Sequence, residues 1–232
     1  MDLAALGLTL RLATVTTVLL LILGTPLAYW IAGITPAGLS STKTRTLPRR
    51  IAQAAVALPL VLPPTVLGFY LLVWLGPARA PGRALIHLIG HPLAFTFSGL
   101  VVGSVLYSLP FAVQPLVLAF SHVDRNLTDV ASTLGASPFT VFRRVILPLS
   151  RTGFLTAAVL TFAHTVGEFG VVLMLGGDIP GLTRTLSISI FDQVQELNYA
   201  AADRTALALV AISFLALLLV YARSAHPQET IS

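Results

Sequence analysis

The sequence predicts an all-α integral membrane protein with five to six transmembrane helices. Of its 232 residues, 56% are hydrophobic and only 10% are charged, and the mean hydropathy is +0.88. A soluble domain carries roughly a quarter charged residues, so this chain has too few charges to cover a globule of its size in water. Its hydrophobic residues are also gathered into stretches long enough to span a membrane. Lipid is therefore the solvent that the composition fits.

Five hydrophobic stretches carry this prediction. They cover residues 10–34, 51–75, 93–120, 152–175 and 204–222. Each is close to the roughly 20 residues that cross about 30 Å of hydrocarbon at 1.5 Å per residue. The first stretch exceeds the roughly 7–15 apolar residues of a signal peptide, so we expect a retained helix. In the third stretch we expect an interruption at Pro110, Gln114 and Pro115.

The basic residues predict an orientation. Nine of the 14 Lys and Arg residues fall on one side of this five-span scheme, namely Lys43, Arg45, Arg49, Arg50, Arg125, Arg143, Arg144, Arg151 and Arg223. The other five are Arg11, Arg79, Arg83, Arg184 and Arg204. Cytoplasmic loops are enriched in Lys and Arg, so we expect the N-terminus outside and the C-terminus in the cytoplasm. No basic helix or aromatic–basic platform indicates nucleic acid as the partner of the net +5 charge.

Prolines interrupt the second stretch at Pro59, Pro63 and Pro64, and Gly68 follows one turn later. Each proline removes a helical hydrogen bond. In lipid the freed backbone groups need partners from neighbouring helices or from water. We therefore expect a broken helix that faces protein or a wet cavity, with a plain structural kink as the alternative.

The loop of residues 121–151 is too long and too patterned for a simple turn. Asp129 fits near the start of a short helix, where the helix dipole favours a negative charge. Gly135 and Pro138 then break the chain, and a second amphipathic piece from Val141 to Leu147 ends at Pro148. A structured loop with an apolar stripe and basic residues predicts a docking surface.

This loop resembles the EAA loop of binding-protein-dependent ABC importer permeases, whose pattern is E-A-A-x3-G-x9-I-x-L-P. Ala131, Gly135, Leu147 and Pro148 match it outright, while Asp129, Val130 and Val145 stand for Glu, Ala and Ile. In such permeases the loop docks into a groove of the ATP-binding subunit. The resemblance assigns this coupling role to Asp129, Ala131, Leu134, Gly135, Ala136, Pro138, Leu147 and Pro148.

Two further stretches narrow the resemblance. The first stretch, residues 58–68, is similar to the corresponding part of molybdate permeases. The second stretch consists of Gly167–Gly170 with residues 177–181 and 183–186. It also resembles molybdate permeases, and sulfate and tungstate permeases carry related versions of it. The likeness covers residues 8–222, followed by a short tail, 223–232. It implies one ABC transmembrane type-1 domain of the MetI-like type I importer fold in the cytoplasmic (inner) membrane. The implied assembly is a homodimer with two ATP-binding subunits and an extracytoplasmic molybdate-binding protein.

The sequence holds no catalytic apparatus. A P-loop needs Gly-Lys-Ser/Thr at its end, and the one lysine, Lys43, follows Thr42. ATP and magnesium are therefore expected in the partner subunit, with no cofactor or metal in this chain. There are no cysteines, and the histidines lack metal-ligand spacing. An ATP-independent secondary transporter remains an alternative class, although no repeat relates the two halves; a membrane enzyme ranks below it.

Small and polar residues of the spans are candidates for the translocation pathway or its gate. These are Pro63, Pro64, Thr65, Gly68, Ser104, Ser108, Thr161 and Glu168. Glu168 is a functional candidate because a carboxylate in a membrane is costly. We favour a structural or gating role for it over substrate contact, and His164 lies at the i,i+4 spacing that permits pairing. Arg184 either attracts an oxyanion, contacts a binding protein or is an ordinary loop residue.

Overall fold

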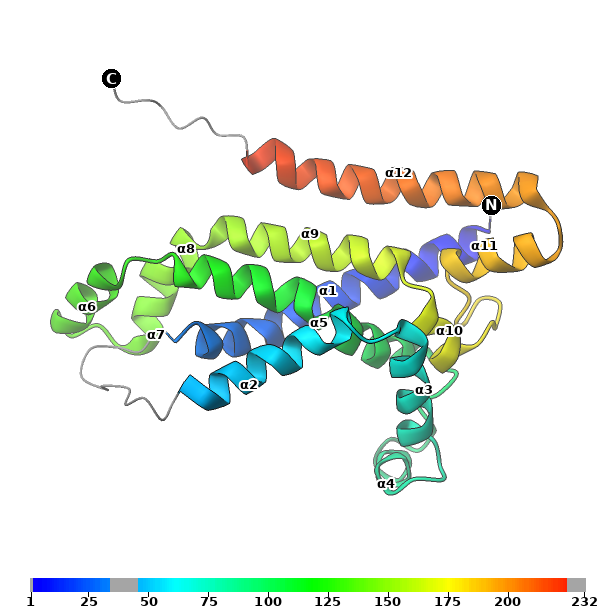
Figure 1. Ribbon diagram of the computed structural model, residues 1–232, viewed down its shortest axis with the longest axis horizontal. Helices are drawn as coiled ribbons and strands as arrows, with labels where there is room; N and C mark the ends of the chain where they lie inside the picture. The colour runs from blue at the N-terminus through cyan, green and yellow to red at the C-terminus, as the bar shows by residue number, and fades with distance from the viewer. Residues whose placement is uncertain (1, 34–45, 225–232) are drawn as a thin grey trace.

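Three long helices form the centre of the molecule. The computed structural model describes residues 2–33 and 46–224, apart from the side chains of residues 46, 220, 223 and 224. In it α1 (Leu3–Ala32), α5 (Phe97–Ser121) and α9 (Arg151–Gly167) pack against one another, and α12 (Tyr199–Ser224) lies along α9 (Figure 1). Lys43, Arg45 and most of the C-terminal tail lie outside the described residues.

Shorter helices connect and extend this bundle. They are α2 (Thr46–Ala57), α3 (Pro64–Leu75), α4 (Ala80–Ile89), α6 (Arg125–Thr133), α7 (Pro138–Val141), α8 (Leu147–Leu149), α10 (Gly170–Gly176) and α11 (Leu186–Gln195). A 3-10 turn, η2 (Leu58–Leu60), continues α2, and a π-helical turn, η3 (Phe142–Ile146), joins α7 to α8. α3 and α4 project sideways from the bundle (Figure 1).

The described part of the chain holds enough apolar helix for five membrane crossings. α1, α5 and α12 are each long and apolar enough to span a membrane. Two bent pairs bring the total to five: residues 47–60 with α3, at 107°, and residues 138–149 with α9, at 72°. The prediction of an all-α membrane protein is therefore confirmed, and the described residues supply up to five spans when each bent pair is one crossing.

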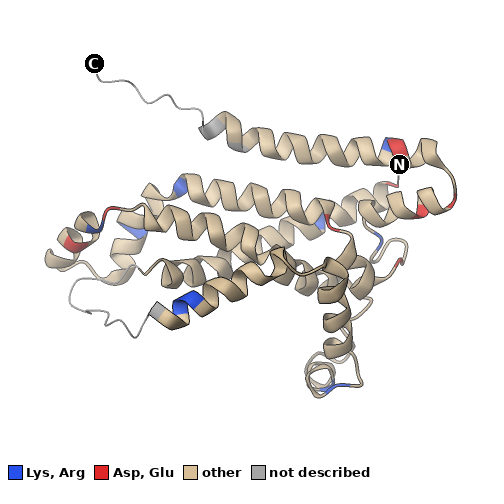
Figure 2. Cartoon of the chain, viewed as in Figure 1, with Lys and Arg blue, Asp and Glu red and all other residues tan. Residues whose placement is uncertain are grey.

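The long helices run between two ends of the molecule. α6, α7, the last turns of α1, the start of α2 and the last turns of α12 lie at one end, called here the loop end (Figure 1). The N-terminus, α11 and the start of α12 lie at the opposite end. Charged residues gather toward both ends, and the middle of the long helices is almost free of them (Figure 2). This distribution suits a bundle whose middle lies in hydrocarbon.

The main hydrophobic core lies in the half of the bundle nearest the loop end. It joins α1, α5 and α9 around Phe120, which is fully buried. Tyr29, Phe142 and Phe154 meet the Phe120 ring edge-on, with ring centroids 6.2, 6.2 and 5.9 Å away. Aromatic pairs in this arrangement add about 0.5–1.5 kcal/mol each beyond the area they bury. A smaller core in the other half contains Leu100.

The structure corrects three expectations about the spans. α5 is continuous through Pro110 and Pro115, so the expected interruption there is wrong. The fourth stretch is divided, because α9 ends at Gly167 and a separate helix, α10, follows. Two short helices, α4 and α11, were not expected. Prolines are tolerated in a transmembrane helix where neighbouring groups satisfy the backbone, which is why Pro110 and Pro115 do not end α5.

Close packing of α9 on α5 gives a prediction at Gly153. A Cβ atom added there would lie 2.2 Å from the Ala119 Cβ atom and 3.3 Å from the Pro115 carbonyl oxygen. Gly153→Ala should therefore lower the free energy of unfolding by about 1–3 kcal/mol, because the helices must separate. The measurement is the melting temperature of the purified protein in detergent. Gly7→Ala is the matched control, since a Cβ atom there meets nothing within 4 Å; equal melting temperatures for the two variants would contradict the packing.

Candidate functional site

The loop between α5 and α9 begins with the capped helix α6. The Asp124 carboxylate accepts a hydrogen bond from the Asn126 backbone N–H at 2.9 Å, so Asp124 is the N-cap. Asp129 lies in the middle of α6 and is half-buried, which corrects its expected place near the helix start. The sequence signal was present, because an aspartate directly before an amphipathic segment is a typical N-cap.

Gly135 ends α6 in a way that explains why a glycine is needed there. Its backbone φ is +81°, in the left-handed region that glycine adopts without strain. The Ala136 N–H donates to the Ala131 carbonyl and the Gly135 N–H donates to the Ser132 carbonyl, both at 3.0 Å. This pair of bonds is the Schellman motif. The expected bend is therefore present, and α7 begins at Pro138 with Ser137 as its cap.

Four apolar side chains of this loop are exposed in the described chain, and we call them the apolar loop face. Leu127, Val130 and Leu134 follow one side of α6 and are 48%, 57% and 83% exposed, and Phe139 on α7 is 71% exposed. They lie at the loop end, beyond the last turns of the long helices (Figure 1). An apolar patch of this kind marks an interaction site. Leu147 and Pro148 are also exposed, further along on α8.

The opposite side of the same loop is fixed to the bundle. Phe142 meets Tyr29 at 5.5 Å between ring centroids and Phe120 at 6.2 Å, so it contacts both α1 and α5. Val141 and Ile146 are buried in the same core, against which Ala131 and Ala136 pack. The loop is therefore packed against the core that α1, α5 and α9 share. Phe142 was not singled out from the sequence, because nothing local distinguishes it from Phe139.

Two breaks in membrane helices meet at one place. The break before α3, at Pro63 and Pro64, lies against the break between α9 and α10. A Cβ atom added to Gly170 would lie 2.8 Å from the Pro64 Cβ atom and 3.3 Å from the Thr65 backbone nitrogen. Gly68, one turn later, packs against α10, where an added Cβ would lie 2.7 Å from the Met174 Cβ. The expectation that the broken helix faces protein is therefore met.

Polar side chains join α5 to α9 and the adjoining break. Glu168 is 5% exposed, and its Oε2 accepts a hydrogen bond from Ser104 Oγ at 2.9 Å. One turn along α5, Ser108 Oγ lies 2.9 Å from His164 Nδ1 and 3.0 Å from Thr165 Oγ1. His164 and Glu168 thus each bind a serine of α5 rather than each other. These pairs are distant in sequence, so only the fold brings them together.

A cavity of about 480 Å³ opens beside the two breaks. Its lining includes Pro64, Thr65, Tyr107, His164 and Glu168. We call it the break cavity. Of the other pathway candidates, Ser104, Ser108 and Thr161 are fully buried within the bundle and do not line it. Ser104 and Ser108 bond across to α9 and Glu168 instead, whereas the buried Thr161 hydroxyl has no hydrogen-bond partner among the described residues. Apart from Glu168, the lining offers neutral hydrogen-bonding groups and an imidazole.

Arg184 lies at the opposite end of the molecule and is already paired. Its Nε and Nη2 donate to the two carboxylate oxygens of Asp178 at 2.5 and 2.9 Å, and Nη2 lies 3.3 Å from Asp192 Oδ2. With two carboxylates beside it, Arg184 is poorly suited to attract an oxyanion. The hydrogen bond from Arg184 lowers the pKa of Asp178. Burial, reinforced by the nearby Asp178, raises the pKa of Asp192 to about 6.

No group of three or more His, Cys, Asp or Glu side chains that could hold a metal ion occurs among the described residues.

Comparison with known proteins assigns the family. The family described as "Binding-protein-dependent transport system inner membrane component" matches residues 24–226. The molybdenum transport system permease protein ModB of Azotobacter vinelandii is 54% identical over 95% of this chain and 93% of its own length. ModB of Escherichia coli K12 is 34% identical over 74% of this chain and 75% of its own. This chain therefore belongs to the family of binding-protein-dependent transport system inner membrane components.

A solved structure supports the fold assignment. A chain of the MetNI methionine ABC transporter, in an inward-facing conformation, superposes with a TM-score of 0.71 over 98% of this chain and 97% of its own. The two sequences are 18% identical, so this likeness concerns the fold alone. The expected MetI-like type I importer permease fold is confirmed. The chain is a multi-pass membrane permease of an ABC importer.

The acidic pair around Arg184 predicts a pH dependence. Folding raises the pKa of Asp192 from 3.8 to about 6. Between these two pH values the Asp192 carboxyl keeps its proton in the folded protein but has lost it in the unfolded chain. The contribution of this proton to the free energy of unfolding is fully present below pH 3.8 and is lost as the pH rises through about 6. Asp178, whose pKa is lowered, titrates below this window. Asp192→Asn should therefore show a flatter melting temperature between about pH 4 and about pH 7 than the wild type; parallel profiles would contradict this reading.

Proposed function

We propose that this chain is the permease subunit of an ATP-driven importer that moves a tetrahedral oxyanion, molybdate first among them, across the cytoplasmic membrane. The observation that carries the proposal is the 54% identity, over 95% of the chain, to a protein named as a molybdenum transport permease. Tungstate and sulfate are the alternative cargoes within the same family.

The proposed assembly contains two copies of this chain, two ATP-binding subunits and an extracytoplasmic molybdate-binding protein. Five spans enclose too little space for a translocation channel, which favours a homodimer. The chain carries no P-loop, so ATP and magnesium are assigned to the partner subunits, and no cofactor to this chain. The apolar loop face is the proposed contact for the ATP-binding subunit.

The proposed orientation places the loop end in the cytoplasm and the N-terminus outside. Arg49, Arg50, Arg125 and Arg151 all lie at the ends of helices that meet there. This bias is the one that cytoplasmic loops show. It puts the apolar loop face on the side where ATP is found.

The proposed mechanism is alternating access driven through the loop. Closure of the ATP-binding subunits moves the apolar loop face, and Phe142 carries that movement to α1 and α5. At the other end of α9, the bonds from Ser104 to Glu168 and from Ser108 to His164 hold the break cavity to α5. We assign Pro63, Pro64, Thr65, Gly68, Ser104, Ser108, Thr161 and Glu168 to the gate region, with Thr65 and Glu168 at its surface.

Uptake measurements test the cargo. Proteoliposomes holding the complete transporter, its binding protein outside and ATP inside, should accumulate labelled molybdate. Unlabelled tungstate should compete and sulfate should compete weakly, because selection rests with the binding protein. Uptake without ATP would overturn the ATP-driven mechanism, and uptake that sulfate abolishes as well as molybdate does would overturn the molybdate assignment.

Removing one apolar contact tests the coupling surface. Leu134→Asp places a charge on a side chain that is 83% exposed, so the fold should be unaffected, because surface substitutions usually change stability by less than about 0.5 kcal/mol. Copurification of the ATP-binding subunit should be lost, because a desolvated carboxylate is costly in an apolar contact. Leu197→Asp, at a 72% exposed leucine at the opposite end, is the control and should copurify normally. Equal recovery of the ATP-binding subunit with both variants would contradict the docking role.

A further inference from the structure

Two glutamine side chains occupy unusual positions on the apolar helices. Gln114 is exposed on α5, a helix that is apolar enough to span the membrane, and Gln53 is exposed on α2. An amide that faces hydrocarbon without a hydrogen-bond partner is strongly unfavourable. Gln114 must therefore face water, a solute or another chain.

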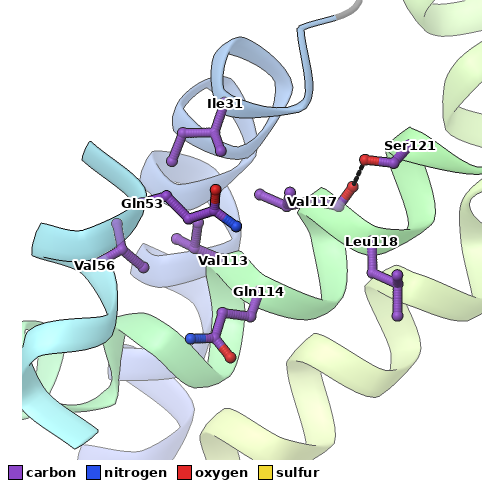
Figure 3. Close-up of a pocket in the computed structure, with 8 residues that line it drawn as sticks. All are labelled: Ile31, Gln53, Val56, Val113, Gln114, Val117, Leu118 and Ser121. Atoms are coloured by element: carbon purple, nitrogen blue, oxygen red, sulfur yellow. Dashed lines mark hydrogen bonds between the residues drawn. The ribbon is translucent and has the colours of Figure 1, made fainter. Parts of the chain in front are cut away.

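Both glutamines face the same hollow. A cavity of about 510 Å³ lies between α1, α2 and α5, and we call it the glutamine cavity. Gln53 from α2 and Gln114 from α5 extend into the space between the two helices, while Ile31, Val56 and Val113 form apolar walls (Figure 3). Two amides from separate helices that converge over apolar walls form a concave polar site rather than a flat contact surface.

The charges around this cavity suit an anion. None of its lining residues is charged, so no carboxylate opposes a negative solute there. Each glutamine amide can turn its NH2 group toward an oxygen and supply two donors. Neutral donors bind an oxyanion without holding it as tightly as a fixed cation would, which suits a site that a solute must leave.

A second hollow adjoins the glutamine cavity at Leu118. Leu118 lines both, and the second hollow, of about 210 Å³, lies between α5 and α9. The second hollow presents His122, Thr152 and Thr156, which also carry hydrogen-bond donors. The neutral polar groups therefore continue from Gln114 to the end of α5, where the basic residues of the loop end begin.

We propose that the amides of Gln53 and Gln114 form a contact site for a tetrahedral oxyanion in the half of the translocation pathway nearest the loop end. This inference rests on the proposed function and adds to it the residues that the anion meets after it has passed the break cavity. The site acts by hydrogen bonding alone.

Transport by variant complexes tests the site. Gln114→Leu should lower molybdate uptake roughly tenfold, the effect of losing a hydrogen bond to a charged group. Gln114→Glu should lower it further by repulsion, while ATP hydrolysis by the complex persists. Gln195→Leu makes the same change on α11, away from the cavity, and should leave uptake unchanged. Wild-type uptake with both Gln114 variants would overturn the site, whereas a wild-type complex that takes up no oxyanion would instead overturn the proposed function.

Thiol labelling tests the site without relying on transport rates. The chain has no cysteine, so Gln114→Cys introduces a single thiol. In the complex it should react with a water-soluble maleimide, and molybdate should slow the reaction. Leu215→Cys is the control, because Leu215 is 59% exposed and lies about as far along α12 as Gln114 lies along α5. Labelling of Gln114→Cys as slow as that of Leu215→Cys, or labelling that molybdate does not slow, would overturn the proposal.

Discussion

The absence of hydrogen-bond partners in hydrocarbon is the constraint on which this structure depends. A helix satisfies its own backbone, but a break at membrane depth exposes groups that lipid cannot pair. Among the described residues, the break before α3 and the break after α9 lie against each other and against α5. Gly68 and Gly170 permit that close approach because neither carries a side chain. The break cavity is a consequence of this arrangement.

The loop between α5 and α9 is built as a compact element that is packed on the bundle. Its backbone is closed by the Asp124 cap and by the turn at Gly135, so α6 keeps its shape outside the membrane. Its apolar residues divide into two sets with different partners. Phe142 and its buried neighbours bind the bundle, whereas Leu134 and its exposed neighbours have no partner within the described chain. A rigid element with one face fixed and one face free is suited to transmit an external force.

Much of the architecture could be predicted from sequence because the determining signals are local. Span length, the loop pattern and the need for a glycine at position 135 depend on neighbouring residues. Predictions from local sequence were wrong where tertiary packing determines the structure. Pro110 and Pro115 read as breaks, yet α5 continues through them, and α4 and α11, at 10 residues each, are too short to stand out beside the spans. The bond between Ser104 and Glu168 joins residues 64 positions apart, and no periodicity in the sequence indicates it.

The distribution of charge explains how a mostly neutral pathway can serve an anion. The one arginine of the loop before α11, Arg184, is held between Asp178 and Asp192, so it contributes little field along the bundle. A fixed cation at membrane depth would bind an oxyanion strongly and would slow its release. Hydroxyl and amide donors can replace part of the hydration of the anion at each step, without a deep energy minimum. Selectivity is then assigned to an external binding protein, and direction to the subunits that hydrolyse ATP, so that the permease needs only a path on which each contact is weak.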